Sequence, residues 1–366
     1  MSIEVPNYIS NIDPYQGGKP IKEVAREIGI SEEKIIKLAS NENPMGISPF
    51  AKKALKNALS EVHRYPDGNA YYLKEALSKK FFLDTNQLII GNGSNDILEL
   101  AARTFVTRGD QVLYSEHAFA VYKIVSQAIG GDGIEAPSAN YSHDLDAFLS
   151  LISDKTKLIF IANPNNPTGT LISKKILKNF LSKVPERIVV VLDEAYDEYL
   201  EDSLKSDSFE WLKDYKNLLI SRSFSKAYGL AGLRIGYGVA APELIEVMNR
   251  VRQPFNVNHF AQIAAIASLD DENFIEESRS INNLGMKQLT NAFNALNLKF
   301  IPSYANFVSF KLEDEKIAMM YYHHLLNNGV IVRPIANYDL PEFLRVSVGL
   351  QRENEIFIKY LSNCNI

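Results

Sequence analysis

A lysine with hydroxyl-bearing neighbours is the residue of this sequence best suited to covalent chemistry. Lys226 follows Ser223 and Ser225, and Arg234 comes eight positions later. Burial of Lys226 among its small and apolar neighbours would favour the neutral, nucleophilic form of the amine. The two hydroxyls and the guanidinium could surround one anion. The segment therefore predicts a nucleophilic lysine beside an anion site, with an ordinary solvated lysine as the alternative.

A carboxylate and a rigid amide-bearing loop follow two other apolar runs. Asp193 ends the run 188–192 and precedes Tyr196 by three positions. Because burial penalises a charged carboxylate, Asp193 needs a cationic partner or protonation there, and a helix N-cap is the structural alternative. Asn166 lies after the run 158–162, in a loop that two prolines and a glycine make rigid. Both loops therefore present polar groups at the ends of predicted strands.

Glycines follow a further apolar run, 88–90, and lead into a helical pattern. The amides of Gly93, Ser94 and Asn95 would lie at a helix start, where they suit a phosphate. A tight turn is the ordinary alternative, and a dinucleotide fingerprint is the competing functional one. Asp96 stands in place of the third glycine of that fingerprint, which counts against a dinucleotide.

Together these groups match pyridoxal phosphate. Lys226 would form an imine with the cofactor aldehyde, and Asp193 would keep the ring nitrogen protonated so that the ring accepts electrons. Asn166 and Tyr196 could hydrogen-bond the phenolic oxygen of the ring. The serine hydroxyls, the guanidinium and the glycine-loop amides would hold the phosphate. Phe119 is the candidate that covers the ring, with plain core packing as its alternative.

The loops that carry these residues follow strand patterns that alternate with helical ones between about residues 50 and 240. Continuous apolar strands alternating with helices indicate a mostly parallel sheet covered on both faces, and hence an α/β fold. The expected strands are 88–90, 111–114, 158–162, 188–192, 218–221 and 236–240, and the expected helices are 50–62 and 97–105. In such sheets ligands bind at the carboxyl ends of the strands, where these loops lie.

After residue 252 the order of elements becomes that of a smaller α+β domain. We expect helices at 21–28, 260–269, 273–296 and 316–327, and strands at 305–310, 330–332 and 343–348. The predicted division is an N-terminal arm with a short helix, associated with the small domain (1–35), a large cofactor-binding domain (36–258) and a small C-terminal domain (259–366).

Composition excludes several classes of protein. The 366 residues carry 39 Lys and Arg against 44 Asp and Glu, a net charge of −5 that disfavours nucleic-acid binding. No apolar run approaches the roughly 20 residues of a membrane span, and no leader pattern opens the chain. With Cys364 as the single cysteine and no histidine spacing typical of a metal site, we predict no metal and a cytoplasmic protein.

The sequence resembles the histidinol-phosphate aminotransferase family, within the fold-type I, class II pyridoxal-phosphate aminotransferases. The likeness spans nearly the whole chain. Its most specific part combines Asp193-x-x-Tyr196, Ser225-Lys226 with Arg234, and Asn166-Pro167-x-Gly169. Further matches are the segments 13–20, 38–44, 63–68, 252–258, 305–307, 329–334 and 344–349.

The resemblance implies roles for particular residues. Lys226 is expected to be the Schiff-base lysine and proton shuttle, Asp193 the pyridinium partner, and Tyr196 a further catalytic residue. A homodimer is implied, in which Tyr65 reaches the cofactor phosphate of the neighbouring subunit. The residues implied to contact substrate are Tyr15, Asn43, Arg333 and Arg345. Arg345 would bind the substrate's acidic group.

The implied reaction exchanges histidinol phosphate and 2-oxoglutarate for imidazole-acetol phosphate and glutamate. An aromatic amino-acid aminotransferase or a threonine-phosphate decarboxylase would keep the cofactor residues and change only the pocket. An NAD-dependent dehydrogenase would leave Lys226 and Asp193 unexplained, and a DNA-binding regulator on this fold would need a further domain. The chain departs from the family pattern at Ser115, His117 and Ala118, where proline, proline and threonine are expected, and this departure affects the predicted ring cover.

Overall fold

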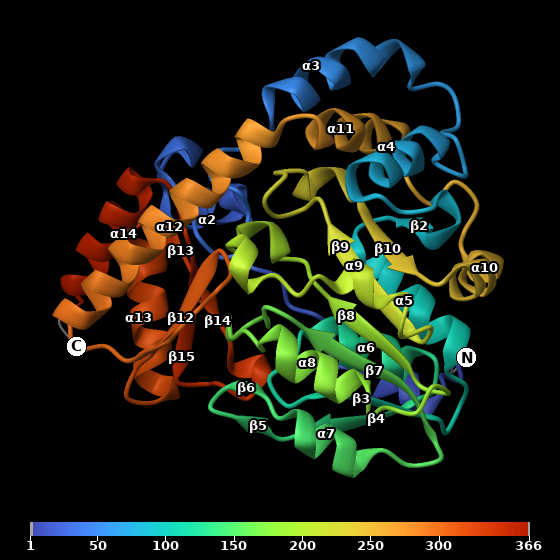
Figure 1. Cartoon of the computed structure of the whole chain (residues 1–366). Coiled ribbons are helices and arrows are strands. Elements are labelled where there is room, and N and C mark those ends of the chain that lie inside the picture. The colour runs from blue at the N-terminus through green and yellow to red at the C-terminus, as the bar shows by residue number, and fades with distance from the viewer. Residues whose placement is uncertain (1–2, 365–366) are drawn as a thin grey trace.

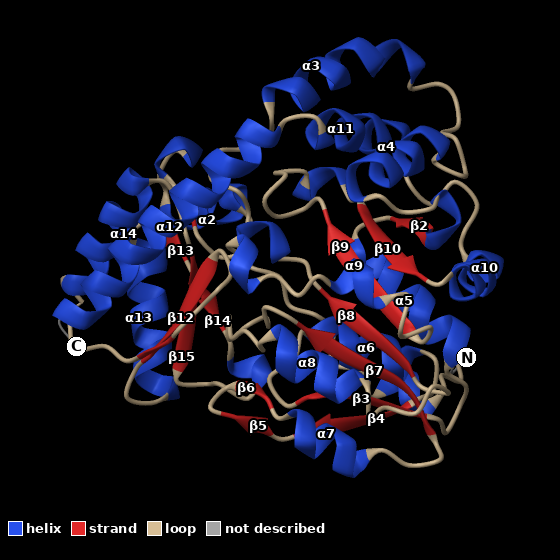
Figure 2. Cartoon of the chain, viewed as in Figure 1, coloured by secondary structure: helices blue, strands red, loops and turns tan. Residues whose placement is uncertain are grey.

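Two β-sheets organise residues 3–364, the part of the chain that the computed structural model describes (Figures 1 and 2). The larger sheet has the strand order β2-β10-β9-β8-β7-β3-β4. Its strands are β2 (Leu88–Gly91), β3 (Gln111–Ser115), β4 (Asp132–Ala136), β7 (Thr156–Ala162), β8 (Val189–Asp193), β9 (Leu218–Ser223) and β10 (Gly236–Ala240). Strand β10 runs opposite to all the other strands of this sheet, which share one direction. The predicted α/β fold with a mostly parallel sheet is confirmed.

Helices cover both faces of the large sheet, which is why its central strands are apolar throughout. In β7, Ile159 and Ile161 join one core while Leu158 and Phe160 join the other, as the two-residue period of a strand requires. Side chains from five helices join the core on the first face: α3 (Pro49–Ala58), α4 (Tyr71–Phe81), α7 (Leu145–Leu151), α8 (Lys174–Leu181) and α11 (His259–Leu269). The second packs against α5 (Ser94–Phe105), α6 (Ala120–Ala128) and α10 (Pro242–Val251).

The smaller sheet is antiparallel, with the order β11-β12-β15-β14. Its strands are β11 (Phe300–Ile301), β12 (Phe307–Lys311), β14 (Arg333–Pro334) and β15 (Phe343–Ser347). Figure 1 shows it beside α12 (Glu272–Ala295), α13 (Glu315–Asn327) and α14 (Gln351–Ser362). Side chains of these helices and of the sheet form a separate core, in which Phe293, Phe310 and Phe357 meet.

The N-terminal arm touches both parts of the molecule. Its helix α2 (Ile21–Ile28) packs Val24 and Ala25 against Leu326 of α13. Next along the chain, β1 (Ile36–Lys37) pairs with β13 (Val330–Ile331). The short α1 (Asn7–Ser10) instead lies against α6. The arm therefore bridges the two sheets from outside.

Several elements differ from the expected ones. The helix expected at 50–62 ends at Ala58 and continues as a 3₁₀ turn, Leu59–Glu61. Edge strand β4, the short β11 and β14, and α14 were not expected, because their segments carry no long apolar run. A small hairpin, β5 (Ser138–Ala139) with β6 (Ser142–His143), and α9 (Ser208–Trp211) complete the elements. Within residues 3–364, no helix is both long and apolar enough to cross a membrane.

Candidate active site

A cavity of about 240 Å³ lies where the parallel strands of the large sheet end. Residues of the small sheet and of the N-terminal arm close its other side. The predicted site residues that line it are Tyr15, Ser94, Asn95, Phe119, Asn166, Asp193, Tyr196, Ser223, Ser225, Lys226, Arg234, Arg333 and Arg345. Loops from distant parts of the sequence therefore meet at the edge of the sheet where a ligand was expected.

Asp193 ends β8 and is 5% exposed. Burial raises the pKa of its carboxyl to about 6, and a hydrogen bond from Tyr122 opposes that rise. The Tyr122 hydroxyl donates to Oδ2 of Asp193 over 2.9 Å. Oδ1 is buried and has no hydrogen-bond partner among the described residues. A buried carboxylate oxygen in a cavity wall fits a cationic group of a ligand.

Lys226 follows β9 in the cavity wall. Burial, and next the positive charge of Arg345, lower the pKa of its amine to about 8. Its Nζ lies 3.4 Å from the carbonyl oxygen of Ser40 and 5.6 Å from the ring centroid of Tyr196. In the described structure no carboxylate forms an ion pair with this amine. The neutral, nucleophilic form is therefore accessible near physiological pH.

Tyr196 lies in the same wall, with its ring edge-on to Phe307 at 5.4 Å. Its hydroxyl accepts a hydrogen bond from the side-chain amide of Asn41 over 2.9 Å. Burial raises the pKa of this hydroxyl beyond its usual range, so Tyr196 stays protonated and can donate a hydrogen bond into the cavity.

The glycine loop and Arg234 form a cradle for an anion. Gly93 precedes α5 with φ of 83°, and a Cβ there would collide with Nη2 of Arg234. Nη1 of Arg234 lies 3.4 Å from the hydroxyl of Ser225. The amides that begin α5 are therefore beside a guanidinium, and both attract a phosphate. Gly93 does not itself line the cavity. Because it has no side chain, the guanidinium of Arg234 can lie directly against it.

Arg345, on β15, is 5% exposed and is held by oxygens that carry no formal charge. Its Nη1 donates to Oδ1 of Asn166 over 2.5 Å, and its Nη2 donates to the carbonyl of Ala39 over 3.0 Å. Burial lowers the pKa of its guanidinium. Its Nε has no partner among the described residues. A buried guanidinium without a carboxylate is suited to a bound anion.

Arg333 enters the cavity from β14. Its guanidinium lies over the ring of Tyr15, 5.5 Å from the centroid, and donates to the carbonyl of Gln16. The N-terminal arm is thus attached to the cavity through the residue that was expected to help bind substrate.

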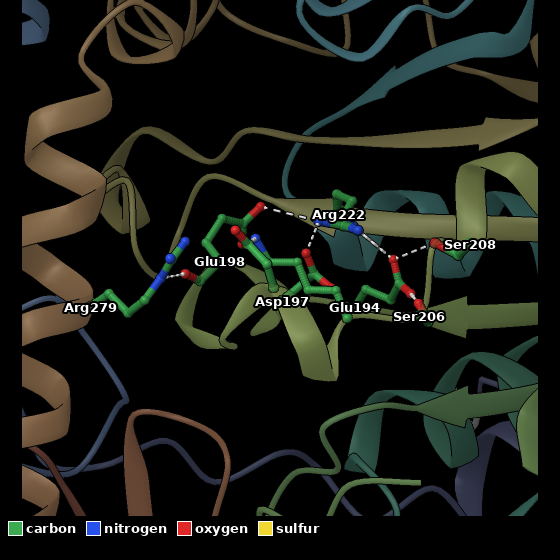
Figure 3. A network of polar contacts seen from close by, with 9 residues as sticks. Glu194, Asp197, Glu198, Ser206, Ser208, Arg222 and Arg279 are labelled. Carbon is green, nitrogen blue, oxygen red and sulfur yellow. Dashed lines mark hydrogen bonds and ion pairs between the residues drawn. The ribbon is translucent and has the colours of Figure 1, made fainter. Parts of the chain in front are cut away.

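Arg222, by contrast, is surrounded by carboxylates of the fold itself (Figure 3). Arg222 of β9 pairs with Glu194 at 2.7 Å and with Asp197 at 2.7 Å, and lies 3.5 Å from Glu198. Hydroxyls of Ser206 and Ser208 complete the partners of Glu194. Within residues 3–364, Arg234, Arg333 and Arg345 have no such carboxylate partners. Arg222 is therefore neutralised within the fold, whereas the cavity arginines are not.

Besides Gly93, two predicted site residues, Tyr65 and Asn43, are absent from the cavity lining. Tyr65 is 83% exposed, and its ring stacks on Phe255 at 4.8 Å. Asn43 is buried behind the site, where its amide donates to the carbonyl of Ala227 and to the hydroxyl of Ser278. Asn43 therefore holds the loop after Lys226 instead of facing a substrate.

Among the lining residues that the sequence analysis did not assign to the site are Tyr122, Asn41 and Tyr338. Tyr122 had a usable signal, because it follows Phe119 at helical spacing. Tyr338 had none, since it lies in the connection between β14 and β15, outside any regular pattern. The carbonyl of Tyr338 bonds Nδ1 of His117 at 2.8 Å, so the unusual His117 ties the segment before Phe119 to the small sheet.

Comparison with known proteins finds a match to the family model described as aminotransferase class I and II over residues 33–361. Among curated proteins, the chain is 57% identical to a histidinol-phosphate aminotransferase of Methylobacillus flagellatus, covering 97% of this chain and 96% of that one. It is 53% identical to histidinol-phosphate aminotransferase 2 of Nitrosospira multiformis, covering 98% and 91%.

Solved structures of related enzymes also match this chain. A histidinol-phosphate aminotransferase from Sinorhizobium meliloti, in complex with pyridoxal-5′-phosphate, matches with a TM-score of 0.92 and 26% identity, covering 100% of this chain and 98% of that one. An L-threonine-O-3-phosphate decarboxylase from Porphyromonas gingivalis matches with a TM-score of 0.78 and 21% identity, covering 90% and 99%. The latter likeness concerns the fold alone.

Proposed function

The chain belongs to the class I and II aminotransferase family, and from that premise we propose that it transfers the amino group of histidinol phosphate to 2-oxoglutarate. The products are imidazole-acetol phosphate and glutamate, and the pathway is histidine biosynthesis. Relatives named histidinol-phosphate aminotransferase are 50–57% identical over nearly the full chain, which supports this substrate. The observation that carries the proposal is a nucleophilic lysine beside three arginines without carboxylate partners in the described structure.

Pyridoxal 5′-phosphate is the cofactor that fits the cavity. The unpartnered Oδ1 of Asp193 suits its ring nitrogen, and the cradle of Arg234 beside the start of α5 suits its phosphate. When bound, this cofactor supplies an aldehyde for an amine and a ring that withdraws electrons from the substrate.

The chain's own residues then have distinct tasks. Lys226 would bind the aldehyde and, once the substrate amine has released it, would move a proton to and from the substrate carbon, which its lowered pKa permits near neutral pH. Asp193 would keep a proton on the ring nitrogen. Tyr196 and the amide of Asn166, which Arg345 holds in place, would hydrogen-bond the ring oxygen. Phe119 would cover the ring face.

Substrate capture is assigned to the arginines of the small sheet. Arg345 binds the acidic group and Arg333 lies beside it, so one pocket accepts a phosphate in one half-reaction and a carboxylate in the other. The ring of Tyr15 and the arm that carries it cover this end of the cavity.

A homodimer completes the proposal. Apolar side chains are exposed along α3, the turn after it and the start of α4: Phe50, Leu59, Val62, Tyr71 and Tyr72 are each more than half exposed. Exposed large apolar side chains gathered in one stretch of chain are typical of an interface. Tyr65 lies in the same stretch of chain, from which we infer that it reaches the cofactor phosphate of the partner. We place the enzyme in the cytoplasm.

The decisive experiment compares amino donors. Purified enzyme loaded with pyridoxal 5′-phosphate is mixed separately with histidinol phosphate, phenylalanine, tyrosine and phosphothreonine, and formation of pyridoxamine 5′-phosphate is followed by absorbance. We expect histidinol phosphate to react fastest per unit concentration. A faster reaction with phenylalanine or tyrosine, or release of CO₂ from phosphothreonine, would refute this substrate. The Lys226→Ala variant is the control and should form pyridoxamine 5′-phosphate from none of these donors at the wild-type rate.

A further inference from the structure

Tyr122 is a fully buried residue that touches two groups of the proposed cofactor site. It lies on α6, three residues after Phe119. Its hydroxyl donates to Oδ2 of Asp193 over 2.9 Å. Its ring stands edge-on to the ring of Phe119, with centroids 5.9 Å apart and an angle of 90°. One side chain thus contacts both the acid and the ring cover.

The ring of Tyr122 cannot turn freely. It stacks on Phe160 of β7 with centroids 4.7 Å apart and planes only 3° from parallel. Phe160 is itself completely buried in the core between the sheet, α5 and α6. Because interiors are densely packed, the hydroxyl cannot move away from Asp193 without displacing that core. The donor is therefore held in one direction.

This fixed donor determines how Asp193 faces the cavity. The terminal torsion of an aspartate is broad, so a carboxylate at a strand end has no preferred plane of its own. The hydrogen bond to Oδ2 fixes the plane of the carboxylate. It leaves Oδ1, which has no partner among the described residues, free for a ligand. The same hydrogen bond favours the charged carboxylate and therefore opposes the rise in the pKa of Asp193 that burial causes.

We propose that Tyr122 is a positioning residue of the cofactor site: it orients the Asp193 carboxylate toward the ring nitrogen of pyridoxal 5′-phosphate and sets the angle of Phe119 against the ring face. The inference rests on the roles proposed above for Asp193 and Phe119. Tyr122 itself touches no reacting atom.

The test is Tyr122→Phe, which removes one oxygen and keeps the stacked ring. The dissociation constant of pyridoxal 5′-phosphate from the full-length protein is measured at pH 6 and at pH 8.5. We expect an increase of about tenfold at pH 6, the size of a lost hydrogen bond to a charged group. The increase should be smaller at pH 8.5, because loss of the bond raises the pKa of Asp193 and more alkaline solution restores its charge.

Two controls separate positioning from general packing. Tyr114→Phe removes another buried tyrosine hydroxyl from the same core, away from the cavity, and should leave cofactor affinity unchanged. In the Asp193→Asn background, Tyr122→Phe should change the dissociation constant less than threefold, because its effect passes through the carboxylate.

An unchanged dissociation constant in Tyr122→Phe would overturn the proposal. So would an equal increase at both pH values and in the Asp193→Asn background, which is what a packing defect produces. If the wild-type protein itself does not bind pyridoxal 5′-phosphate, the proposed cofactor site fails, and that result is distinguishable because it precedes any substitution.

Discussion

Whether an arginine binds a ligand here depends on what already surrounds it. Arg222 and Arg345 are both almost fully buried, but three carboxylates surround Arg222 and none pairs with Arg345 in the described structure. A buried charge without an ionic partner is costly, so a fold keeps one chiefly where a ligand will supply the partner. The two sites therefore differ in the charge of the groups around the guanidinium and not in the arginine itself.

Substitution of Arg345 tests this distinction. In Arg345→Lys the charge remains but the planar fork is lost, so we expect KM for both substrates to rise by about 10- to 150-fold. Steady-state kinetics with each substrate varied in turn measures the change. Arg103→Ala, which breaks an exposed ion pair with Glu99, should leave both values unchanged. Unaltered kcat/KM in Arg345→Lys would contradict the role.

The lowered pKa of Lys226 predicts a pH dependence for cofactor capture. Only the neutral amine attacks an aldehyde, and its pKa is about 8. The rate at which cofactor-free enzyme takes up pyridoxal 5′-phosphate should therefore rise about tenfold per pH unit below 8 and level off above it. Stopped-flow absorbance between pH 6.5 and 9.5 measures the rate. A rate that still rises tenfold per pH unit between pH 8.5 and 9.5, as for an exposed lysine, would contradict the prediction.

At the scale of elements, the side chains at the end of β8 and in the loop after it fall into two groups: one faces the cavity and the other lies behind it. Asp193 and Tyr196 face the cavity, whereas Glu194, Asp197 and Glu198 lie behind it around Arg222 (Figure 3). Arg222 directly precedes Ser223 in the chain, so the ion pairs join the loop that carries the acid to the loop that carries the lysine.

This cluster contains more negative than positive charge. Burial raises the pKa of Glu198 to about 7, above its ordinary value of 4.5. A raised pKa in the folded state contributes stability below about pH 4.5, and that contribution is lost as the pH rises through 7.

Glu198→Gln should therefore have nearly wild-type stability at pH 5 and be more stable by about 1–3 kcal/mol at pH 8. Urea unfolding at the two pH values measures the difference, with the exposed Glu99→Gln as a matched control. Lower stability of Glu198→Gln at both pH values would contradict this sign.

The sequence was sufficient for the strands whose apolar runs are continuous and for the loops at their carboxyl ends. Asp193 was located because it directly follows such a run, and Asn166 and Lys226 because each lies within five positions of the end of one. The direction of β10 and the partners of Arg222 depend on which segments become neighbours in space, and local spacing does not contain that information. The domain boundary at residue 258 stays a prediction; the packing of α11 on α3 and α4 favours one closer to α12.

At the scale of the whole molecule, the proposed dimer makes each site depend on two chains. A mixture of Lys226→Ala and Tyr65→Ala chains tests this dependence. In a mixed dimer, the chain that keeps Lys226 receives an intact Tyr65 from its partner, so one site of the two is complete. With half of the dimers mixed, activity should reach about a quarter of wild type. Co-refolding followed by assay measures it; activity no greater than the average of the two variants would contradict shared sites.

The long helix α12 limits how the two sheets can move relative to one another. At about 1.5 Å per residue its 24 residues form a rod roughly 36 Å long. Near its start Ile275 packs with the large-sheet core, and near its end Phe293 lies in the small-sheet core. Such a rod bends little, so it fixes the distance between the two cores along its axis. The Ser48 hydroxyl donates to Asp271 over 2.5 Å, and this bond ties the N-cap of α12 to the N-cap of α3.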